Sequence, residues 1–268
     1  KDGTFLLSGT YGTSEGQSLY FREYDTPENN NGLSEGCDGL ENHNLFMLIT
    51  RGGLRVEAAY GDRLRRNPTG SWETIFNLPG SEDVDRQGMF DIAYTLEMSD
   101  KLVLSAHAQY QAYTYRGDFI YDAAEEGEPV LPIVNRDTSA SHWLDCEARL
   151  SCEKFEGHKL SGGLEYRNNF KALLKNEDVE TSEMNVDVSA PSRVWGVFAQ
   201  DEYRLADWLI LNAGARYDWV EPTGLNHVSP RAGVVLQPFK RTTVKILYGE
   251  AFRAPNSYET DYMDGRTS

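Results

Sequence analysis

Apolar and polar residues alternate with a period of two along most of this 268-residue chain. From Leu209 to Trp219 every second side chain is apolar or aromatic, while the intervening set contains Asn212, Arg216 and Asp218. Because successive side chains of a β-strand point to opposite faces, this pattern predicts strands with one apolar and one polar face. No stretch of comparable length has helical periodicity. The predicted fold class is all-β.

The alternation divides the chain into about eleven expected strands, separated by connections of two lengths. The strands are expected near residues 4–11, 43–51, 54–61, 88–97, 102–115, 142–153, 158–167, 193–205, 209–220, 228–238 and 242–251. Short turns join alternate pairs. The other connections are long polar segments, at 12–42, 62–85, 116–141 and 168–192, with a shorter one near 221–227. Long loops at every second connection predict an antiparallel up-and-down sheet whose loops leave from one end.

Strands that run toward the long loops carry a tyrosine at their far end, in phase with the apolar face. These residues are Tyr11, Tyr60, Tyr110, Tyr166, Tyr217 and Tyr248. A phenol combines an apolar ring with a hydroxyl that needs water, which suits the headgroup boundary of a membrane. Six to eight residues at ~3.3 Å, tilted by ~40°, climb ~15–20 Å, most of the apolar band of a membrane barrel. The pattern predicts a transmembrane β-barrel with apolar side chains toward lipid.

The net negative charge is concentrated in the long segments. The four long segments carry −15 of the net charge of −16, so the strands and short turns are almost neutral. A strongly acidic chain disfavours nucleic acid as a partner. On the polar strand faces both signs interleave, which suits a wet lumen better than a catalytic carboxylate pair. The residues expected to face the lumen are Glu147, Arg149, Glu202, Arg204, Arg216, Arg231 and Arg253.

The long segments also contain the candidate ligand-binding residues. Aromatic side chains at a barrel mouth can hold a ligand, and equally they can pack the loops against one another. The candidates are Tyr20, Phe21, Tyr24, Trp72, Tyr115 and Tyr121. Asp25, Glu28 and Asp38 are candidate Ca²⁺ ligands, although they lack the EF-hand pattern and solvated charge is the simpler interpretation.

Enzymatic activity is not expected. Gly12–Gly16 matches G-x-S-x-G, but the residues after it are turn-rich, whereas a nucleophile elbow needs a helix there. The five histidines show no metal-binding spacing, and no cofactor is expected. Cys146 and Cys152 are expected on one strand, ~20 Å apart at ~3.3 Å per residue, which is too far for a disulfide. At most Cys37 pairs with one of them, and free apolar cysteines are predicted in preference to such a bond.

Two runs near the C-terminus are specific enough to suggest a family. Ser229–Gly233 reads S-P-R-A-G, and Tyr248–Pro255 reads Y-G-E-A-F-R-A-P. Their order resembles the barrel of TonB-dependent outer-membrane receptors, and Leu19–Asp25 is similar to an early extracellular loop of these receptors. The resemblance implies a 22-stranded barrel around a plug domain in the outer membrane of Gram-negative bacteria. It also implies uptake of a scarce nutrient (ferric siderophore, cobalamin or haem) with energy passed through TonB.

The same resemblance implies that residues 1–268 are one partial β-barrel domain, about half a barrel, without the plug and the segment that contacts TonB. A piece of barrel has two edge strands with unpaired backbone groups, so the isolated chain is expected to pair its edges with another copy. Two alternatives remain open at this point: a plug-less diffusion porin, and a soluble all-β ligand-binding module of the carbohydrate-binding type.

Overall fold

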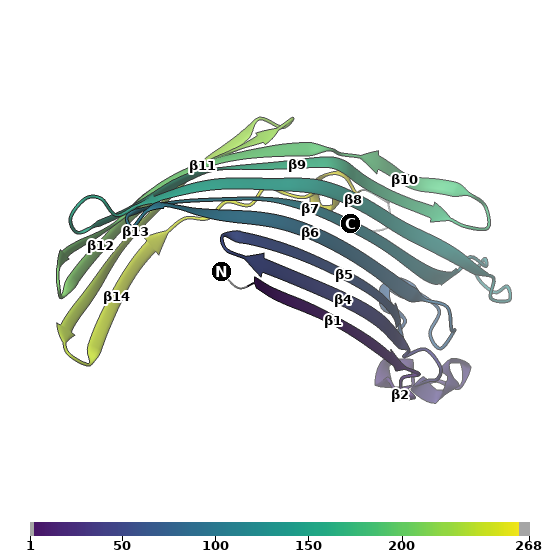
Figure 1. Ribbon diagram of the computed structural model, residues 1–268. Helices are drawn as coiled ribbons and strands as arrows, with labels where there is room; N and C mark the ends of the chain where they lie inside the picture. The colour runs from purple at the N-terminus through teal and green to yellow at the C-terminus, as the bar shows by residue number, and fades with distance from the viewer. Residues whose placement is uncertain (1–2, 263–268) are drawn as a thin grey trace.

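The computed structural model describes residues 3–262, and most of them form a single curved antiparallel sheet (Figure 1). The strands are β1 (Gly3–Ser14), β2 (Leu19–Tyr20), β3 (Leu33–Ser34), β4 (Leu40–Arg51), β5 (Leu54–Arg66), β6 (Glu82–Ser99), β7 (Leu102–Asp122), β8 (Pro132–Cys152), β9 (His158–Asp178), β10 (Glu183–Ser189), β11 (Ser192–Ala206), β12 (Leu209–Glu221), β13 (Leu225–Phe239) and β14 (Thr242–Gly249). The helical segments are η1 (Arg22–Tyr24), η2 (Pro27–Gly32), η3 (Ser71–Glu73) and α1 (Ser257–Asp261).

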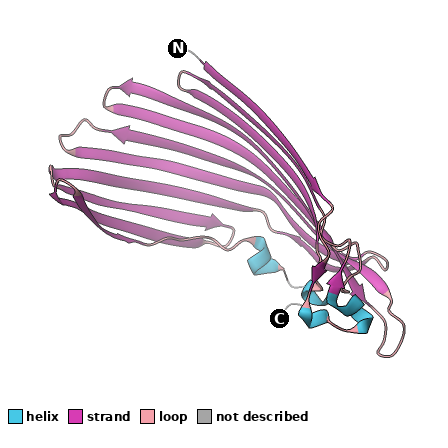
Figure 2. Ribbon diagram, turned by 90° about the horizontal axis from the view of Figure 1, so that it is seen from below, coloured by secondary structure: helices cyan, strands magenta, loops and turns pink. Residues whose placement is uncertain are grey.

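The strands follow one another across the sheet in the order β1-β4-β5-β6-β7-β8-β9-β11-β12-β13-β14, and every pairing is antiparallel. All eleven strands expected from the alternation are present, which confirms the all-β, up-and-down architecture. Strand β10 pairs only with β9, and β2 pairs only with β3. Figure 2 shows the helices and long loops gathered at one end of the sheet and short turns at the other.

Three of the loops expected from the sequence are shorter in the structure than predicted. Strands β7, β8 and β9 each have 21 residues, so parts of 116–141 and 168–192 are strand. Likewise β5 and β6 extend into 62–85. A membrane strand needs only about 9–11 residues, and the extra length continues the wall on the loop side. Polar residues occupy both faces there, so no apolar alternation marks these strand ends in the sequence.

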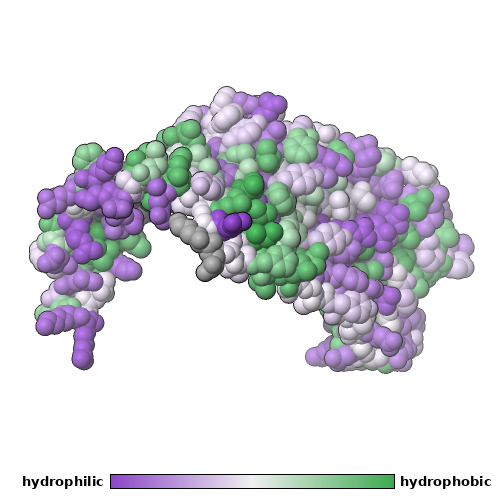
Figure 3. All heavy atoms as spheres, viewed as in Figure 1, coloured by the Kyte–Doolittle hydropathy of each residue, from purple (hydrophilic) through white to green (hydrophobic). Residues whose placement is uncertain are grey.

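The strand register places the two side-chain sets on opposite faces. Directly opposed residues share a face, and the register links Phe90, Tyr110 and Leu144 on one face and Ala93, His107 and Glu147 on the other. The first face is the convex, apolar one, where large side chains stay exposed, such as Phe5, Leu7, Leu45, Leu164, Val197 and Ile246. In Figure 3, apolar surface covers the middle of the visible side, while polar surface dominates toward both ends.

Buried apolar residues are found mostly at the loop end, because no second layer covers the sheet. They are Cys37, Phe76, Val84, Phe119, Ile120, Ala172, Leu174, Val186 and Val220. A soluble sandwich would instead bury one face of each sheet in a shared core. The single layer with an exposed apolar face is typical of a barrel wall in lipid.

The six tyrosines of the predicted belt share the convex face according to the register. Several contact other rings on that face. Tyr11 lies 4.9 Å from the ring of His43, and Tyr166 lies 4.2 Å from the ring of Trp195, measured between centroids. The prediction that these tyrosines are in phase with the apolar face is confirmed.

Strands β1 and β14 each have a neighbour on one side only, so the sheet is an open wall (Figure 1). Cys37, Cys146 and Cys152 are free, and the last two lie on β8 as predicted. Within residues 3–262, no helix is both long and apolar enough to cross a bilayer.

Candidate functional site

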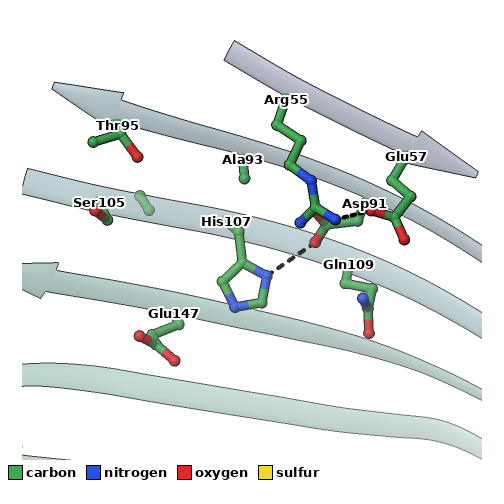
Figure 4. Close-up of a pocket in the computed structure, with 10 residues that line it drawn as sticks. Arg55, Glu57, Asp91, Ala93, Thr95, Ser105, His107, Gln109 and Glu147 are labelled. Atoms are coloured by element: carbon green, nitrogen blue, oxygen red, sulfur yellow. Dashed lines mark hydrogen bonds and ion pairs between the residues drawn. The ribbon is translucent and has the colours of Figure 1, made fainter. Parts of the chain in front are cut away.

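The concave face carries ion pairs where the convex face carries apolar side chains. Near the short-turn end, Asp91 of β6 accepts a hydrogen bond from His107 of β7 at 3.0 Å, and Arg55 pairs with Glu57 on β5. With Glu147 of β8 these side chains line a hollow of ≈ 320 Å³ (Figure 4). The hollow is polar and open, which suits water or another polar surface better than a buried apolar ligand.

A second ionic group lies further along the concave face, on β9, β11 and β12. The guanidinium of Arg216 lies 2.6 Å from Glu165 and 2.7 Å from Asp218. It reaches Glu165 on β9 by crossing Gly196 of β11, where an added Cβ would stand 2.4 Å from the Arg216 Nη2 atom. Glycine at this position therefore allows the bridge between the strands.

Toward the loops, two parallel triads cross β5, β6 and β7. Arg63 donates to Asp85 at 2.6 Å, and Tyr113 donates to the other oxygen of the same carboxylate at 2.7 Å. Arg65 and Tyr115 contact Asp83 in the same way, at 2.8 and 2.7 Å. Each carboxylate is therefore bound by one cation and one phenol.

These triads lie outside the membrane-spanning part of the wall, because Tyr113 and Tyr115 are about 8–13 Å above the level of Tyr110 at ~3.3 Å per residue on a strand tilted by ~40°. Burial and the hydrogen bond to the Asp83 carboxylate raise the pKa of Tyr115. Burial opposes ionisation of Asp85, yet the hydrogen bonds from Arg63 and Tyr113 prevail and lower its pKa. At neutral pH the mouth therefore holds the ionised carboxylate of Asp85 and the neutral phenol of Tyr115.

An amide network continues this polar rim across β8, β9 and β10. Asn135 donates to Asn176 and Asp178 at 2.9 and 2.6 Å, and Asn176 donates to Asp137 at 2.8 Å. Asn185 of β10 also donates to Asn176, at 2.9 Å. Buried polar groups need such partners, and the network holds the tall wall together beside the buried apolar residues of β9 and β10, Ala172, Leu174 and Val186.

Above the rim, residues of the segments 12–42 and 62–85 pack together around Phe76. The ring of Tyr24 stacks on it at 4.2 Å, and Phe21 meets it edge-on at 5.9 Å. Tyr24 also donates to the carbonyl of Gly70 at 3.2 Å. Since Phe76 is only 8% exposed, Phe21 and Tyr24 serve the packing of the loops, which was one of the two interpretations open for them.

Trp72 and Tyr20 are the exposed members of this aromatic group. Trp72 is 67% exposed and touches Phe119 edge-on at 5.5 Å, and Tyr20 is 58% exposed and donates to Asp25 at 2.8 Å. Trp72 also has φ +55°, a left-handed conformation that is uncommon for a large side chain. The loop fold thus presents this indole to solvent on a packed support.

The segment after β14 lies on the concave side and reaches the polar rim (Figure 1, yellow). Asn256 caps α1 through a reciprocal capping box with Glu259, and Arg253 binds Glu259 with two hydrogen bonds of 2.9 and 2.6 Å. At its end, Tyr262 donates to Asp137 at 2.6 Å. The segment therefore connects the β14 edge with the rim on β8.

This cap gives a pH-dependent prediction. Hydrogen bonds from Arg253 and from the backbone N–H of Asn256 lower the pKa of Glu259 to about 2, against about 4.3 for a free glutamate. A carboxyl group whose pKa is lowered in the folded state stabilises that state at any pH above the pKa of the unfolded state. This stability is lost as the pH falls from the unfolded-state pKa to the folded-state pKa. We expect α1 to loosen between about pH 4.3 and pH 2, seen as a fall in the protection of its amides against hydrogen exchange relative to the intrinsic rate at each pH, whereas Glu259→Gln should remove this pH dependence. Protection that stays constant in the native protein over that range would contradict the assignment.

The structure brings most predicted lumen residues together. Glu147, Arg149, Glu202, Arg204, Arg216 and Arg231 all share the concave face by register. Arg253 does not stand on the wall, because the chain has left the sheet after Gly249 and this guanidinium binds Glu259.

Of the loop candidates, Tyr115 and Tyr121 lie on β7 instead of in a loop. The calcium candidates do not gather. Asp25 accepts from Tyr20, Asp38 accepts from the backbone N–H of Gln17, and Glu28 lies in η2. Within residues 3–262 no group of three or more His, Cys, Asp or Glu side chains could hold a metal ion.

The sequence did not predict that the triads and the amide network at the loop end form one polar surface. Their central residues lie within the segments expected to be loops: Asp83, Asp85, Asn135, Asn176 and Asp178. Asp83 and Asp85, and likewise Asn176 and Asp178, are two residues apart, as side chains on one face of a strand are. This spacing indicates a strand only when the residues between are apolar, and without them the sequence resembles an ordinary polar loop.

The geometry defines a class of protein: an up-and-down β-barrel wall, with an apolar convex face, an aqueous ion-paired concave face and elaborated loops at one end. The family description "TonB dependent receptor-like, beta-barrel" matches residues 7–266. The chain belongs to the TonB-dependent receptor family. No curated protein matched it.

Solved structures share the fold at low sequence identity. A mutant of the ferric enterobactin receptor PfeA from Pseudomonas aeruginosa is 18% identical with a TM-score of 0.69, covering 96% of this chain and 40% of that one. The copper transporter OprC is 14% identical with a TM-score of 0.69, over 95% and 41%. The FrpB iron transporter from Neisseria meningitidis (F5-1 variant) is 17% identical with a TM-score of 0.62, over 95% and 44%. The chain therefore spans about 40% of the length of PfeA.

Proposed function

We propose that the protein containing this chain imports a scarce metal, as a soluble chelate, across the outer membrane of a Gram-negative bacterium. Energy would reach it through TonB, and a plug domain would occupy the concave side. Binding would use the exposed loop aromatics and the polar rim, with no covalent chemistry. Among the nutrients that this family takes up, a metal chelate is favoured because similar structures are named for ferric enterobactin, copper and iron.

One observation carries the proposal: the concave face is lined by hydrated ion pairs, such as His107–Asp91 and Arg216–Glu165, while the convex face is apolar. A soluble binding module offers no account of the exposed apolar face. A plug-less porin shares the two faces but not the family match over 7–266. The acidic loops disfavour a strongly anionic chelate unless cations bridge it.

The direct test is to disrupt the gene for this chain in its source bacterium and to measure uptake of radioactive iron and copper chelates. We expect uptake of one chelate to fall to background, and the same loss when a protonophore removes the energy supply of the unmodified strain. Unchanged uptake of every chelate in the disrupted strain would contradict the proposal. Uptake that persists without energy would favour the porin.

We expect Trp72→Ala to weaken chelate binding about tenfold, because a large exposed aromatic on a rigid support is the kind of residue that dominates binding. The measurement is a binding titration on intact cells. Tyr60→Ala is the matched control, since Tyr60 is an exposed aromatic residue on the convex face and should leave affinity unchanged. Equal affinity for Trp72→Ala and the unmodified protein would remove Trp72 from the site.

The isolated chain is a separate case, because β1 and β14 have open edges. We propose that two copies pair along these edges, which light scattering would detect as dimers or larger species. A monodisperse monomer without detergent would contradict this pairing.

A further inference from the structure

The concave face is not uniformly charged. On β1 its residues are Thr4, Leu6, Ser8, Thr10, Gly12 and Ser14, and on β4 they are Leu40, Asn42, Asn44, Phe46, Leu48 and Thr50. None of these residues is charged, although each strand has 12 residues and a membrane strand needs only about 9–11. We call this surface of β1 and β4 the uncharged lane.

The adjoining strands differ sharply. From β5 onward the concave face carries ion pairs both near the short turns and near the loops, for example Glu57 with Arg55 and Asp85 with Arg63. The same holds across β8 and β9, where Arg167 binds Asp145 at 2.6 Å. Within the described wall, a solute that moves from the loops to the short turns along β5–β9 passes fixed charges at two levels, whereas along the lane it passes only hydroxyl, amide, aliphatic and aromatic groups.

The lane is also hollowed at its middle. Ser8, Thr10, Asn44, Phe46, Ala59 and Gly61 help to line a depression of ≈ 410 Å³. Gly61 of β5 lies opposite Asn44, and a Cβ added to it would meet only the Asn44 Oδ1 atom, at 3.2 Å. The depression therefore exists because Ala59 and Gly61 of β5, which face Phe46 and Asn44 of β4, fill little space.

A passage must hold a solute strongly enough to admit it and weakly enough to release it. Hydrogen bonds between neutral groups exchange with water at little net cost, whereas charge-assisted bonds hold roughly twice as strongly. A charged wall would also attract the polar groups of a plug. The lane is thus the part of this wall from which both a plug and a hydrophilic chelate separate most easily.

We propose that the uncharged lane on β1 and β4 is the path along which the imported chelate moves past the plug. Ala59 and Gly61 of β5 border the lane at its hollow, and the ion-paired surface that begins with the charged residues of β5 then forms the static side of the lumen. This inference rests on the proposed function, and it adds a location and a wall chemistry to it.

The test is to fill the depression with a large side chain and to measure chelate uptake. We expect Gly61→Trp to lower the maximal uptake rate of the chelate about tenfold, while binding to the cell surface stays unchanged. Gly61→Ala should keep nearly normal uptake, because a methyl group leaves most of the hollow open. Ser8→Trp, on β1, provides a second block if Gly61→Trp does not reach the membrane.

The matched control is Ser141→Trp on β8. Ser141 belongs to the same register row as Gly61, through Gln87 and Tyr113, and points to the same concave face. We expect it to transport normally. Normal uptake by Gly61→Trp and Ser8→Trp, or equal losses in these variants and the control, would overturn the lane. If the unmodified protein imports no chelate, the proposed function itself is wrong, and the lane falls with it.

Discussion

Phe76→Ala should unfold the loop cluster at the barrel mouth. Phe76 is nearly buried and supports Tyr24 by stacking and Phe21 by an edge contact. Removing a buried phenylalanine ring costs about 3–5 kcal/mol. Among the described residues, the ring contacts between segments 12–42 and 62–85 all involve Phe76. We therefore expect both segments to become mobile while the strands below keep their pairing.

Limited proteolysis on intact cells measures this effect. In the unmodified protein, cleavage within 12–42 should be slow, and in Phe76→Ala it should be fast at the same protease concentration. Trp72→Ala is the control, because Trp72 is equally large but mostly exposed; it should keep the slow cleavage although it weakens ligand binding. Equal protection in Phe76→Ala and the unmodified protein would mean that the loops are held by other contacts.

Leu164→Arg should destabilise the barrel in lipid by about 1–2 kcal/mol, because the cost of a basic side chain on the outer face falls from about 2–4 kcal/mol at the bilayer midplane to about 0–1 kcal/mol at the interface and Leu164 lies two residues below Tyr166 of the tyrosine belt. Leu164 is 61% exposed on the convex face of β9, between Ala148 and Val197 in the ladder. The arginine would place a charge in contact with lipid, and neither Ala148 nor Val197 could pair with that charge.

The control uses the other face of the same strand. Ser161 lies on the concave face, opposite Ser151 and Gln200, and Ser161→Arg should change stability by less than about 1 kcal/mol, as most exposed substitutions do. The measurement is the free energy of unfolding in lipid vesicles, from denaturant titration. Equal losses for the two variants would mean that lipid and water do not divide the two faces.

The sequence predicted the membrane part of this fold well, because lipid on one side and water on the other impose strict alternation. Leu209–Trp219 illustrates this, since its face assignments match the register of β11, β12 and β13. The S-P-R-A-G and F-R-A-P runs predicted the family. Both signals are local in the chain.

The loop end of the sheet was harder to predict, because polar residues lie on both faces of its strands. Residues Lys175–Asp178 are all polar and yet belong to β9, held by the amides of Asn135 and Asn176. Strand β10 was missed for the same reason. Neither the pairing of Phe76 with Tyr24 nor the passage of Arg216 across Gly196 follows from spacing, since each joins residues whose proximity is decided by the fold.

The account depends on one claim: the convex face meets lipid and the concave face does not. Two tryptophans test it directly, because Trp195 is on the convex face beside Tyr166, and Trp143 is on the concave face, where it donates to Asp145 at 3.1 Å. The measurement is fluorescence quenching by lipids brominated along their chains, in variants that keep one tryptophan each. We predict strong quenching of Trp195 and almost none of Trp143, and the reverse order, or equal quenching, would contradict the claim.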